Sequence, residues 1–326
     1  MLKQAVGLAL LAQNGQVDVV MTPLANIQVN AGSKTYTLVI PADRQYTDFI
    51  FEMYSPDGSF LPAMITQVLV KPNGKQFQTF AMPDLISMNK YFTMPDPGLI
   101  ANYYRIQLSQ LRPALLGGTA FVDPTNNVFF CGDPGSAREV TTLNCKSQDG
   151  AGREINQLTF QFTCTGVTNA ASAINVYALA SPPYPGGAGL VKMIDQTTFN
   201  AVAGQNVLAQ NNGLNFGDAS HAFLDQLFFF TTGGSTLDNW QVWYNGSEIR
   251  QRSEALNEFI QTMAAPVMRA SQVGASSQYV LDFTESLLGD KILAIGDPNT
   301  ALQIRFTASA AGAITVYQVS EGYLAL

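Results

Sequence analysis

The sequence predicts an all-β chain built from two consecutive β-sandwich domains, each with one short helix after a hairpin. Short alternating segments with turn signals roughly every 8 to 12 residues indicate antiparallel strands, and helical periodicity occurs once in each half. The Ala-Gly pair at 31–32 returns at 203–204, and the Asn-Gly pair at 73–74 returns at 245–246, so both recur at the same separation. Matching features in the same order predict a duplicated fold.

A hairpin is predicted at the same place in each half. An apolar run lies ahead of it, at 48–53 in the first half and at 225–230 in the second, a slightly wider separation than that of the dipeptides. Alternating segments at 68–71 and 240–244 then lead into the Asn-Gly pairs. Asn and Gly tolerate the positive φ angles that a type I′ turn needs at both central positions, so each pair marks a hairpin turn.

One helix is predicted after each hairpin, where the apolar period changes. In the second half the apolar residues recur at i, i+3, i+4 and i+7, which places them on one helix face: Leu256, Phe259, Ile260 and Met263. The first half repeats this stripe at the positions that correspond to Leu256, Phe259 and Met263, and its residues are Leu85, Met88 and Phe92.

The ends of the two halves also correspond. Predicted strands at 104–109, 158–163 and 174–177 match segments at 279–284, 302–307 and 314–317. The turn Cys131-Gly132-Asp133-Pro134 parallels Ile295-Gly296-Asp297-Pro298. Between this turn and the next strand the first half has an extra segment, 135–157, which we interpret as a surface loop.

These boundaries predict five segments. They are an N-terminal arm at 1–22, a first sandwich at 23–181, a Pro/Gly-rich linker at 182–193, a second sandwich at 194–320 and a C-terminal tail at 321–326. The linker contains two Pro-Pro or Pro-Gly pairs and a run of glycines, which cannot continue a strand. Each half has the size of one β-sandwich domain.

Composition argues for self-association and against nucleic-acid binding. Only 13% of the residues are charged, so the polar surface must come mainly from uncharged side chains, which suits packing against further copies. The net charge is −7, and the 17 basic residues are scattered singly. A phosphate backbone needs a basic patch, so we expect no extensive nucleic-acid contact.

The three cysteines favour buried small side chains. Cys131, Cys145 and Cys164 have no metal-ligand spacing, and an odd number argues against a disulfide scaffold. The repeat aligns Cys131 with Ile295 and Cys164 with Ala308, which indicates apolar positions. One bridge, from Cys145 to either of the other two, stays open.

The N-terminal arm carries the one apolar stretch of membrane interest. Its apolar run at 1–12 is too short to span a bilayer. A signal peptide, a helix on a membrane or a neighbouring subunit, and an arm folded onto its own domain all remain open. The candidate residues for contact with a membrane or a partner are Leu2, Lys3, Val6, Leu10 and Leu11.

The search for chemistry identifies no catalytic, cofactor or metal residue. His221 is the sole histidine, too few for the common zinc motifs, and no Gly-x-Ser-x-Gly elbow accompanies it. We interpret it as a strand-edge residue. The acidic candidates are Asp48 with Glu52 and Asp225 with Glu248, but the repeat aligns Asp48 with Asp225, which favours a structural role. The Gly-rich segment 186–192 lacks phosphate-loop spacing.

The ordered, repeated features resemble a known family. They are the Ala31-Gly32 strand start, the hairpin at 68–75 with the helix at 85–92, and Trp243-Tyr244-Asn245-Gly246 followed by its own helix. Together they resemble the double jelly-roll major capsid proteins of tailless icosahedral viruses, in particular bacteriophages with an internal membrane. The resemblance covers about Pro23 to Tyr323.

This resemblance implies two eight-stranded jelly rolls, with three copies forming a pseudo-hexagonal homotrimer in an icosahedral shell. The loop at 135–157 is then a candidate tower or clamp between subunits, although the short loops argue against large turrets. The arm faces an internal membrane. The implied partners are further copies, vertex (penton) proteins and minor capsid proteins, and the implied location is the virion, assembled in the host cytoplasm.

Two alternatives belong to other functional classes. A secreted double-jelly-roll glycan amidase would use the acidic pairs, and we would expect a signal peptide and disulfides. A glycan-binding adhesin would expose Trp240 and Trp243, which we expect on one strand face with Val242 on the other. We interpret burial of an indole in a subunit contact as the better explanation.

Overall fold

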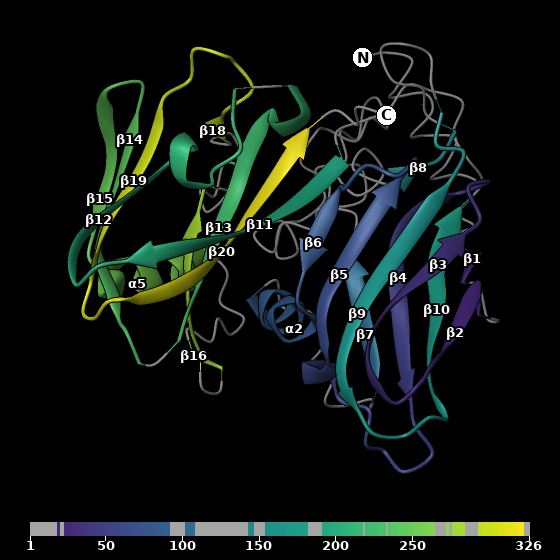
Figure 1. Cartoon of the computed structure of the whole chain (residues 1–326). Coiled ribbons are helices and arrows are strands. Elements are labelled where there is room, and N and C mark those ends of the chain that lie inside the picture. Colours follow the sequence, from purple (N-terminus) through teal and green to yellow (C-terminus); the bar gives the residue numbers. More distant parts are fainter. Residues whose placement is uncertain are drawn as a thin grey trace. The chain divides into compact units, whose positions relative to one another are not determined.

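The computed structural model describes residues 18–19, 23–91, 102–107, 143–146, 154–181, 191–217, 219–232, 234–264, 272–273, 276–283 and 293–322. These residues are mainly β-strand, as predicted (Figure 1). The chain divides into two compact units. Unit 1 comprises residues 1–86, 95–192 and 323–326, and unit 2 comprises residues 87–94 and 193–322.

Unit 1 consists of two antiparallel sheets. The strands of its first sheet are β1 (Asp18–Val19), β2 (Ala25–Val29), β4 (Gln45–Tyr54), β7 (Tyr103–Gln107), β8 (Leu143–Asn144) and β10 (Ser172–Ser181). Strand β10 pairs with β1 and β2 on one side and with β4 on the other, and β4 pairs with β7 and β8. The second sheet contains β3 (Gly32–Ile40), β5 (Ile65–Pro72), β6 (Gln78–Phe80) and β9 (Leu158–Val167), in the order β6-β5-β9-β3.

Unit 2 repeats this arrangement. The strands of its first sheet are β11 (Val191–Ala201), β13 (Phe223–Thr231), β16 (Gln272–Val273), β17 (Ser276–Asp282), β18 (Leu293–Ala294) and β20 (Gly312–Gly322). Their order is β11-β20-β13-β17, with β16 on β17 and β18 on β13. The second sheet contains β12 (Gly204–Ala209), β14 (Leu237–Tyr244), β15 (Ser247–Arg252) and β19 (Leu302–Ala308), in the order β15-β14-β19-β12. The duplication is confirmed, because each sheet of unit 1 has a counterpart with the same strand order.

The helices follow the hairpins, also as predicted. Helix α2 (Met82–Tyr91) comes after β6, and helix α5 (Glu254–Ala264) comes after β15. Three short 3-10 turns complete the described elements: η1 (Pro62–Met64), η3 (Gln210–Asn212) and η4 (Ala219–His221).

Both predicted hairpin turns have the conformation that the Asn-Gly pairs indicate. The φ angles are 46° and 82° at Asn73 and Gly74, and 49° and 81° at Asn245 and Gly246. These values are positive at both central positions, as a type I′ turn requires. The glycines that begin β3 and β12 also match, with φ angles of 102° and 101°.

The strand pairing corrects one predicted alignment by a single residue. In β4, Asp48 pairs with Leu179, whereas the corresponding partner in β20, Val319, pairs with Gln226. Strand β13 is therefore aligned with β4 one position further along than predicted. A register irregularity beside these pairs, in both sheets, hides the shift from a sequence comparison. Asp48 and Asp225 are not equivalent positions, and Gln226 is the counterpart of Asp48.

A second alignment was wrong as well. The backbone N–H of Cys145 donates to Arg44, and that of Ile295 donates to Ala222, which the corrected alignment makes the counterpart of Arg44. Cys145, not Cys131, is therefore the counterpart of Ile295, and both side chains are buried. The extra length of the first half shifts accordingly. It lies mainly between β7 and β8, at 108–142 against 283–292 between β17 and β18, and only a small part follows β8.

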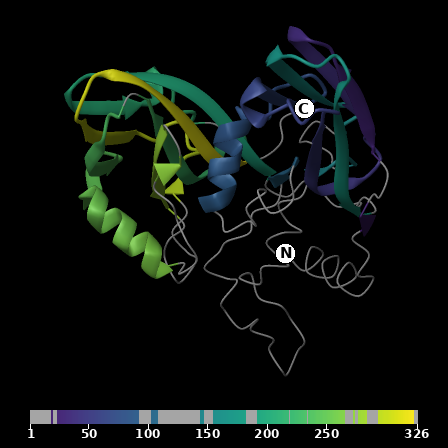
Figure 2. The same ribbon diagram turned by 90° about the horizontal axis from the view of Figure 1, so that it is seen from below.

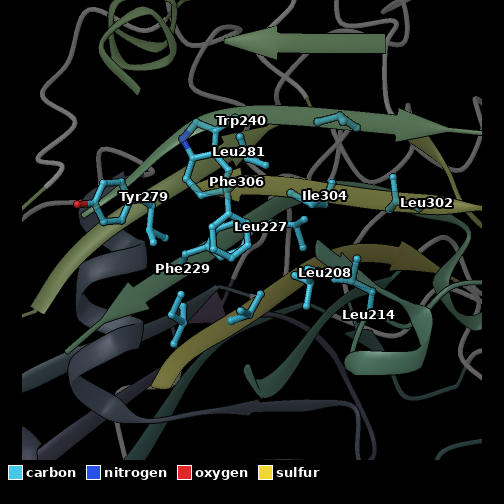
Figure 3. Close-up of a cluster of buried hydrophobic side chains, with 14 of the residues drawn as sticks. Leu208, Leu214, Leu227, Phe229, Trp240, Tyr279, Leu281, Leu302, Ile304 and Phe306 are labelled. Atoms are coloured by element: carbon cyan, nitrogen blue, oxygen red, sulfur yellow. The ribbon is translucent and has the colours of Figure 1, made fainter. Parts of the chain in front are cut away.

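Each unit has its own aromatic core. In unit 1, Phe49 and Phe51 of β4 meet Phe160 and Phe162 of β9 edge to face, at centroid distances of 4.8 to 5.3 Å. In unit 2, Trp240 packs against Phe229 and Phe306 (Figure 3). The ring centroids are 4.9 and 5.3 Å apart, respectively. Both cores join the two sheets of a sandwich, as the jelly roll requires.

Candidate functional surface

The candidate contact residues of the N-terminal arm, Leu2, Lys3, Val6, Leu10 and Leu11, lie outside the described residues. Of the predicted arm, residues 18–19 form β1, which pairs with β10 at Leu179 and Ala180. Most of the predicted loop at 135–157, and Cys131, also lie outside the described residues. Among the residues that the structure describes, no helix is long and apolar enough to cross a membrane.

The acidic residues of unit 1 are held in structural contacts. Asp48 is fully buried and binds Arg105 through two contacts of 2.9 Å, to Nε and to Nη2. Glu52 accepts hydrogen bonds from the hydroxyls of Tyr103 and Tyr177, both 2.8 Å, and from the amide of Asn175. Partial burial raises the pKa of Glu52, but the three hydrogen bonds outweigh it and lower the pKa below its usual range. Asp48 and Glu52 lie four positions apart on one strand, about 13 Å, so they do not form a catalytic pair.

The acidic residues of unit 2 are also apart. Asp225 is buried on β13, whereas Glu248 is exposed on β15, which belongs to the other sheet. Within the described ranges, no three His, Cys, Asp or Glu side chains lie close enough to hold a metal ion.

His221 has a more specific environment than a strand edge. It ends η4, and its Nε2 lies 2.6 Å from Oδ2 of Asp195 on β11. Its Nδ1 lies 3.1 Å from the hydroxyl of Ser220. The ring therefore ties η4 to β11 next to the start of β13, which is a structural arrangement within unit 2.

The two tryptophans lie on opposite sides of β14, so the prediction of a shared face was wrong. Trp240 and Val242 are both fully buried in the core. Because side chains alternate along a strand, Trp243 points to the other side of β14, where the Arg305 guanidinium lies 4.5 Å from its ring centroid. Trp240 is thus buried in its own domain core and is not part of an exposed platform.

The described cysteines are buried free thiols. Cys145 and Cys164 are not bonded to each other, and neither side chain is exposed. Burial raises the pKa of the Cys145 thiol to about 12 and that of the Cys164 thiol to about 11. Thiols protonated at neutral pH in this way are poor nucleophiles, which agrees with the predicted role as small apolar side chains.

Helix α5 turns its polar side inward, which the sequence analysis missed. Asn257 and Gln261 are buried, and both side-chain amides donate to the carbonyl oxygen of Val280, at 2.8 and 2.7 Å. The predicted apolar stripe faces outward instead: Leu256 is 45% exposed and Phe259 is 61% exposed. In Figure 2 this light-green helix lies at the periphery of unit 2. The polar residues at i and i+4 were the signal that could have revealed this orientation.

Helix α2 carries its stripe in a covered position, and the structure shifts the predicted helix alignment by one residue. The backbone N–H of Leu85 donates to Ala81 as that of Asn257 donates to Ser253, so Leu85 corresponds to Asn257 and Met88 corresponds to Ile260. Leu85 and Met88 are only 3% and 2% exposed. Residues 87–91 of this helix belong to unit 2, although their sequence belongs to the first half. There Tyr91 packs edge to face on Phe228 at 5.3 Å, and its hydroxyl donates to Asp282 at 2.7 Å.

The outer face of the sheet that contains β13 and β20 is buried, whereas the corresponding face of the sheet that contains β4 and β10 is partly exposed to solvent. Strand residues alternate between faces, so Phe228 and Phe230 point away from the core that contains Leu227 and Phe229. They are nevertheless buried, as is Tyr317, which packs edge to face on Phe230. On the corresponding face of unit 1, side chains remain partly or largely accessible: Ile50, Glu52, Tyr103 and Tyr177.

Two family models match the chain. The model of the viral coat protein P2 N-terminal domain matches residues 21–120, and that of the viral coat protein P2 C-terminal domain matches residues 190–320. Together they cover more than half of the chain and one model falls on each half. No curated protein sequence matches the chain.

Solved structures with similar folds cover nearly the whole chain. The major capsid protein P2 from bacteriophage PM2 is 14% identical with a TM-score of 0.68, covering 92% of this chain and 97% of that one. The STIV major capsid protein is 11% identical with a TM-score of 0.58, covering 94% and 95%. The PBCV-1 virus capsid protein is 10% identical with a TM-score of 0.55, covering 94% of each chain. These likenesses show a shared double jelly-roll fold.

Proposed function

The chain belongs to the viral coat protein P2 family and is a capsid protein with the double jelly-roll fold, and we propose that it is the major protein of an icosahedral shell. Three copies associate into a pseudo-hexagonal homotrimer. This proposal makes the protein structural, with no catalytic residue, and places its work in binding to further copies of itself.

The observation that supports this proposal most strongly is the matched strand order of the two units. Six similar jelly rolls result when three such chains associate, so a three-fold oligomer can occupy a six-fold position in a shell. A single jelly roll would need six separate chains for the same position.

The mass of the purified protein in solution tests the proposal. Native mass spectrometry should give a species with three times the 35.2 kDa of one chain. Electron micrographs of the same sample should show hexagonal particles. A monomer that persists at high protein concentration would contradict the proposal.

The N-terminal arm is proposed to contact an internal membrane from its surface. Support comes from the apolar side chains of Leu2, Val6, Leu10 and Leu11 with the single positive charge of Lys3. The full chain should float with vesicles that contain anionic lipid, and a variant without residues 1–17 should not. Equal flotation of both would contradict this role while leaving the coat function untouched.

The remaining assignments are proposals of the same kind. We infer the segment boundaries at 1–22, 23–181, 182–193, 194–320 and 321–326, vertex and minor capsid proteins as further partners, and assembly in the host cytoplasm. The glycan amidase has no support from the contacts of Asp48, Glu52, Asp225 and Glu248, and the adhesin has none from Trp240.

A further inference from the structure

Two surfaces of the described chain combine apolar or aromatic side chains with exposure to solvent. One is the outward stripe of α5, with Leu256 and Phe259. The other is the outer face of β4, β7 and β10, around Ile50 and Tyr103. We call them the α5 stripe and the β4 face. Isolated exposed apolar residues are common in monomers, so exposure alone identifies no binding site.

The internal repeat gives each surface a counterpart that is covered. On α2 the position of Phe259 is occupied by Ser87, which is 8% exposed, and that of Ile260 by Met88, which is 2% exposed, whereas Phe259 itself is 61% exposed. The counterpart of the β4 face is the outer face of β13, β17 and β20, where Phe228 and Tyr317 are buried.

The two covered counterparts also touch each other. Tyr91, at the end of α2, packs on Phe228 and donates a hydrogen bond to Asp282. The corrected strand alignment assigns Ile50 to the position of Phe228, and the helix alignment assigns Met263 to the position of Tyr91. A helix from the first half of the sequence therefore covers a sheet of the second half, whereas the α5 stripe and the β4 face remain accessible in the described part of the chain.

We propose that the equivalent contact for α5 forms between two copies: the α5 stripe of one copy packs on the β4 face of the next. This inference rests on the proposed homotrimer and names the surfaces that build it. Because the two surfaces differ, the contact is heterologous, and a heterologous contact that closes produces a ring. A trimer then contains three contacts that α2 makes within its own chain and three contacts that α5 makes with the next copy.

The chemistry of the two surfaces is compatible. Phe259 supplies an aromatic ring, and the β4 face supplies the rings of Tyr103 and Tyr177, whose hydroxyls already donate to Glu52. Because these hydroxyls have a partner, the tyrosines can bury their ring faces without leaving a donor unsatisfied. Tyrosine is one of the residue types enriched among the few side chains that carry most of the binding energy in protein interfaces.

The double substitution Leu256→Gln/Phe259→Gln tests the contact with little risk to the fold, because both side chains point outward and Gln is a good helix former. The expected result is a threefold loss of mass in native mass spectrometry, from trimer to monomer, with an unchanged circular dichroism spectrum. Val202→Gln is the matched control, since Val202 of the same unit is 59% exposed. The control should remain trimeric.

The outcomes separate this contact from the proposed function. Trimers that survive the double substitution overturn the α5 contact and leave the trimeric coat protein in place. A wild-type chain that stays monomeric contradicts both. Loss of trimer in the Val202 control as well would overturn the assignment to α5.

Chemical crosslinking tests the contact without weakening it. The full chain carrying Ile50→Cys and Met263→Cys should be joined into dimers and trimers by a short bifunctional maleimide, as seen on a denaturing gel. Either single variant should give only the background of the wild-type cysteines. A double variant that shows no more than this background would overturn the proposal even if the Gln variants fail to fold.

Discussion

The two jelly rolls share their strand order and hairpin turns but have different residues at corresponding buried positions. In unit 1 the buried Asp48 is neutralised by Arg105, whereas the counterparts of these residues in unit 2 are Gln226 and Val280. In unit 2 the core is filled by Trp240, whereas its counterpart in unit 1 is Val68. Strand order is thus what the fold requires, and the individual contacts are where the halves have diverged.

The largest effect is expected from breaking the core of unit 2. Trp240→Ala removes a fully buried indole that packs on Phe229 and Phe306, so the free energy of unfolding should fall by about 4 kcal/mol. Val68→Ala, at the corresponding position of unit 1, should cost about half as much because fewer atoms are removed. Urea unfolding of the full chain, followed by circular dichroism, compares the two. Equal losses would mean that the two cores tolerate cavities in the same way.

The second effect is expected from the ion pair that only unit 1 has at this position. Arg105→Ala leaves the Asp48 carboxylate buried without its partner, which should cost about 3 kcal/mol. The double variant Asp48→Gln/Arg105→Val reproduces the residues of unit 2 and should regain most of that loss, because no charge remains buried. Urea unfolding measures both variants. A double variant no more stable than Arg105→Ala would show that the surroundings of Asp48 and Arg105 in unit 1 do not accommodate the Gln and Val side chains found in unit 2.

The third effect is a pH dependence of stability that arises from a buried carboxyl group of unit 2. Burial raises the pKa of Glu254, at the start of α5, to about 8, although the hydrogen bond from the Trp240 indole opposes the shift. The folded chain therefore keeps the Glu254 proton between about pH 4.5 and 8, where the unfolded chain has lost it. The stabilising effect of this proton is complete below pH 4.5 and is lost as the pH rises to 8.

Unfolding of the wild-type chain should accordingly become easier by roughly 2 kcal/mol between pH 5 and pH 8. Glu254→Gln should remove this part of the pH dependence, since the amide is neutral throughout. Thermal unfolding at several pH values provides the measurement, with the exposed Glu248→Gln as the control. An identical pH profile for wild type and Glu254→Gln would show that the proton is not held in the folded state.

Much of the fold was predictable because its signals are local. The Asn-Gly pairs specify their turns through backbone conformation, and the change of apolar period locates both helices to within a few residues. The order of these signals then predicts the duplication. Family membership followed from that order, with no single residue as a signature.

The errors arose where packing decides between patterns that look alike in sequence. Helix α5 has an apolar stripe and also the polar set Glu254, Asn257 and Gln261, and the structure buries the polar one. A register irregularity moved the counterpart of Asp48 by one residue. Because Gly-Asp-Pro follows both Cys131 and Ile295, the sequence comparison aligned these two residues, whereas the backbone hydrogen bonds show that Cys145 is the counterpart of Ile295.

The smallest effect compares the two hairpin turns themselves. Asn73 makes three side-chain hydrogen bonds: its Oδ1 accepts from the backbone of Asn156 and Gln157, and its Nδ2 donates to the carbonyl of Glu154. Oδ1 of Asn245 accepts from the backbone N–H of Ala301, at 2.8 Å. Both residues have positive φ, which Ala tolerates poorly.

Asn73→Ala should therefore cost about 2 kcal/mol and Asn245→Ala about 1 kcal/mol, because the strain is shared and the number of broken hydrogen bonds differs. Asn73→Gly and Asn245→Gly are the matched controls, since Gly keeps the turn conformation and removes only the side-chain contacts. Urea unfolding of the four variants measures the difference. If the two Gly variants lose equal stability, the contacts of Asn73 to Asn156 and Glu154 add nothing, and the hairpins contribute to their jelly rolls through the turn conformation that they share.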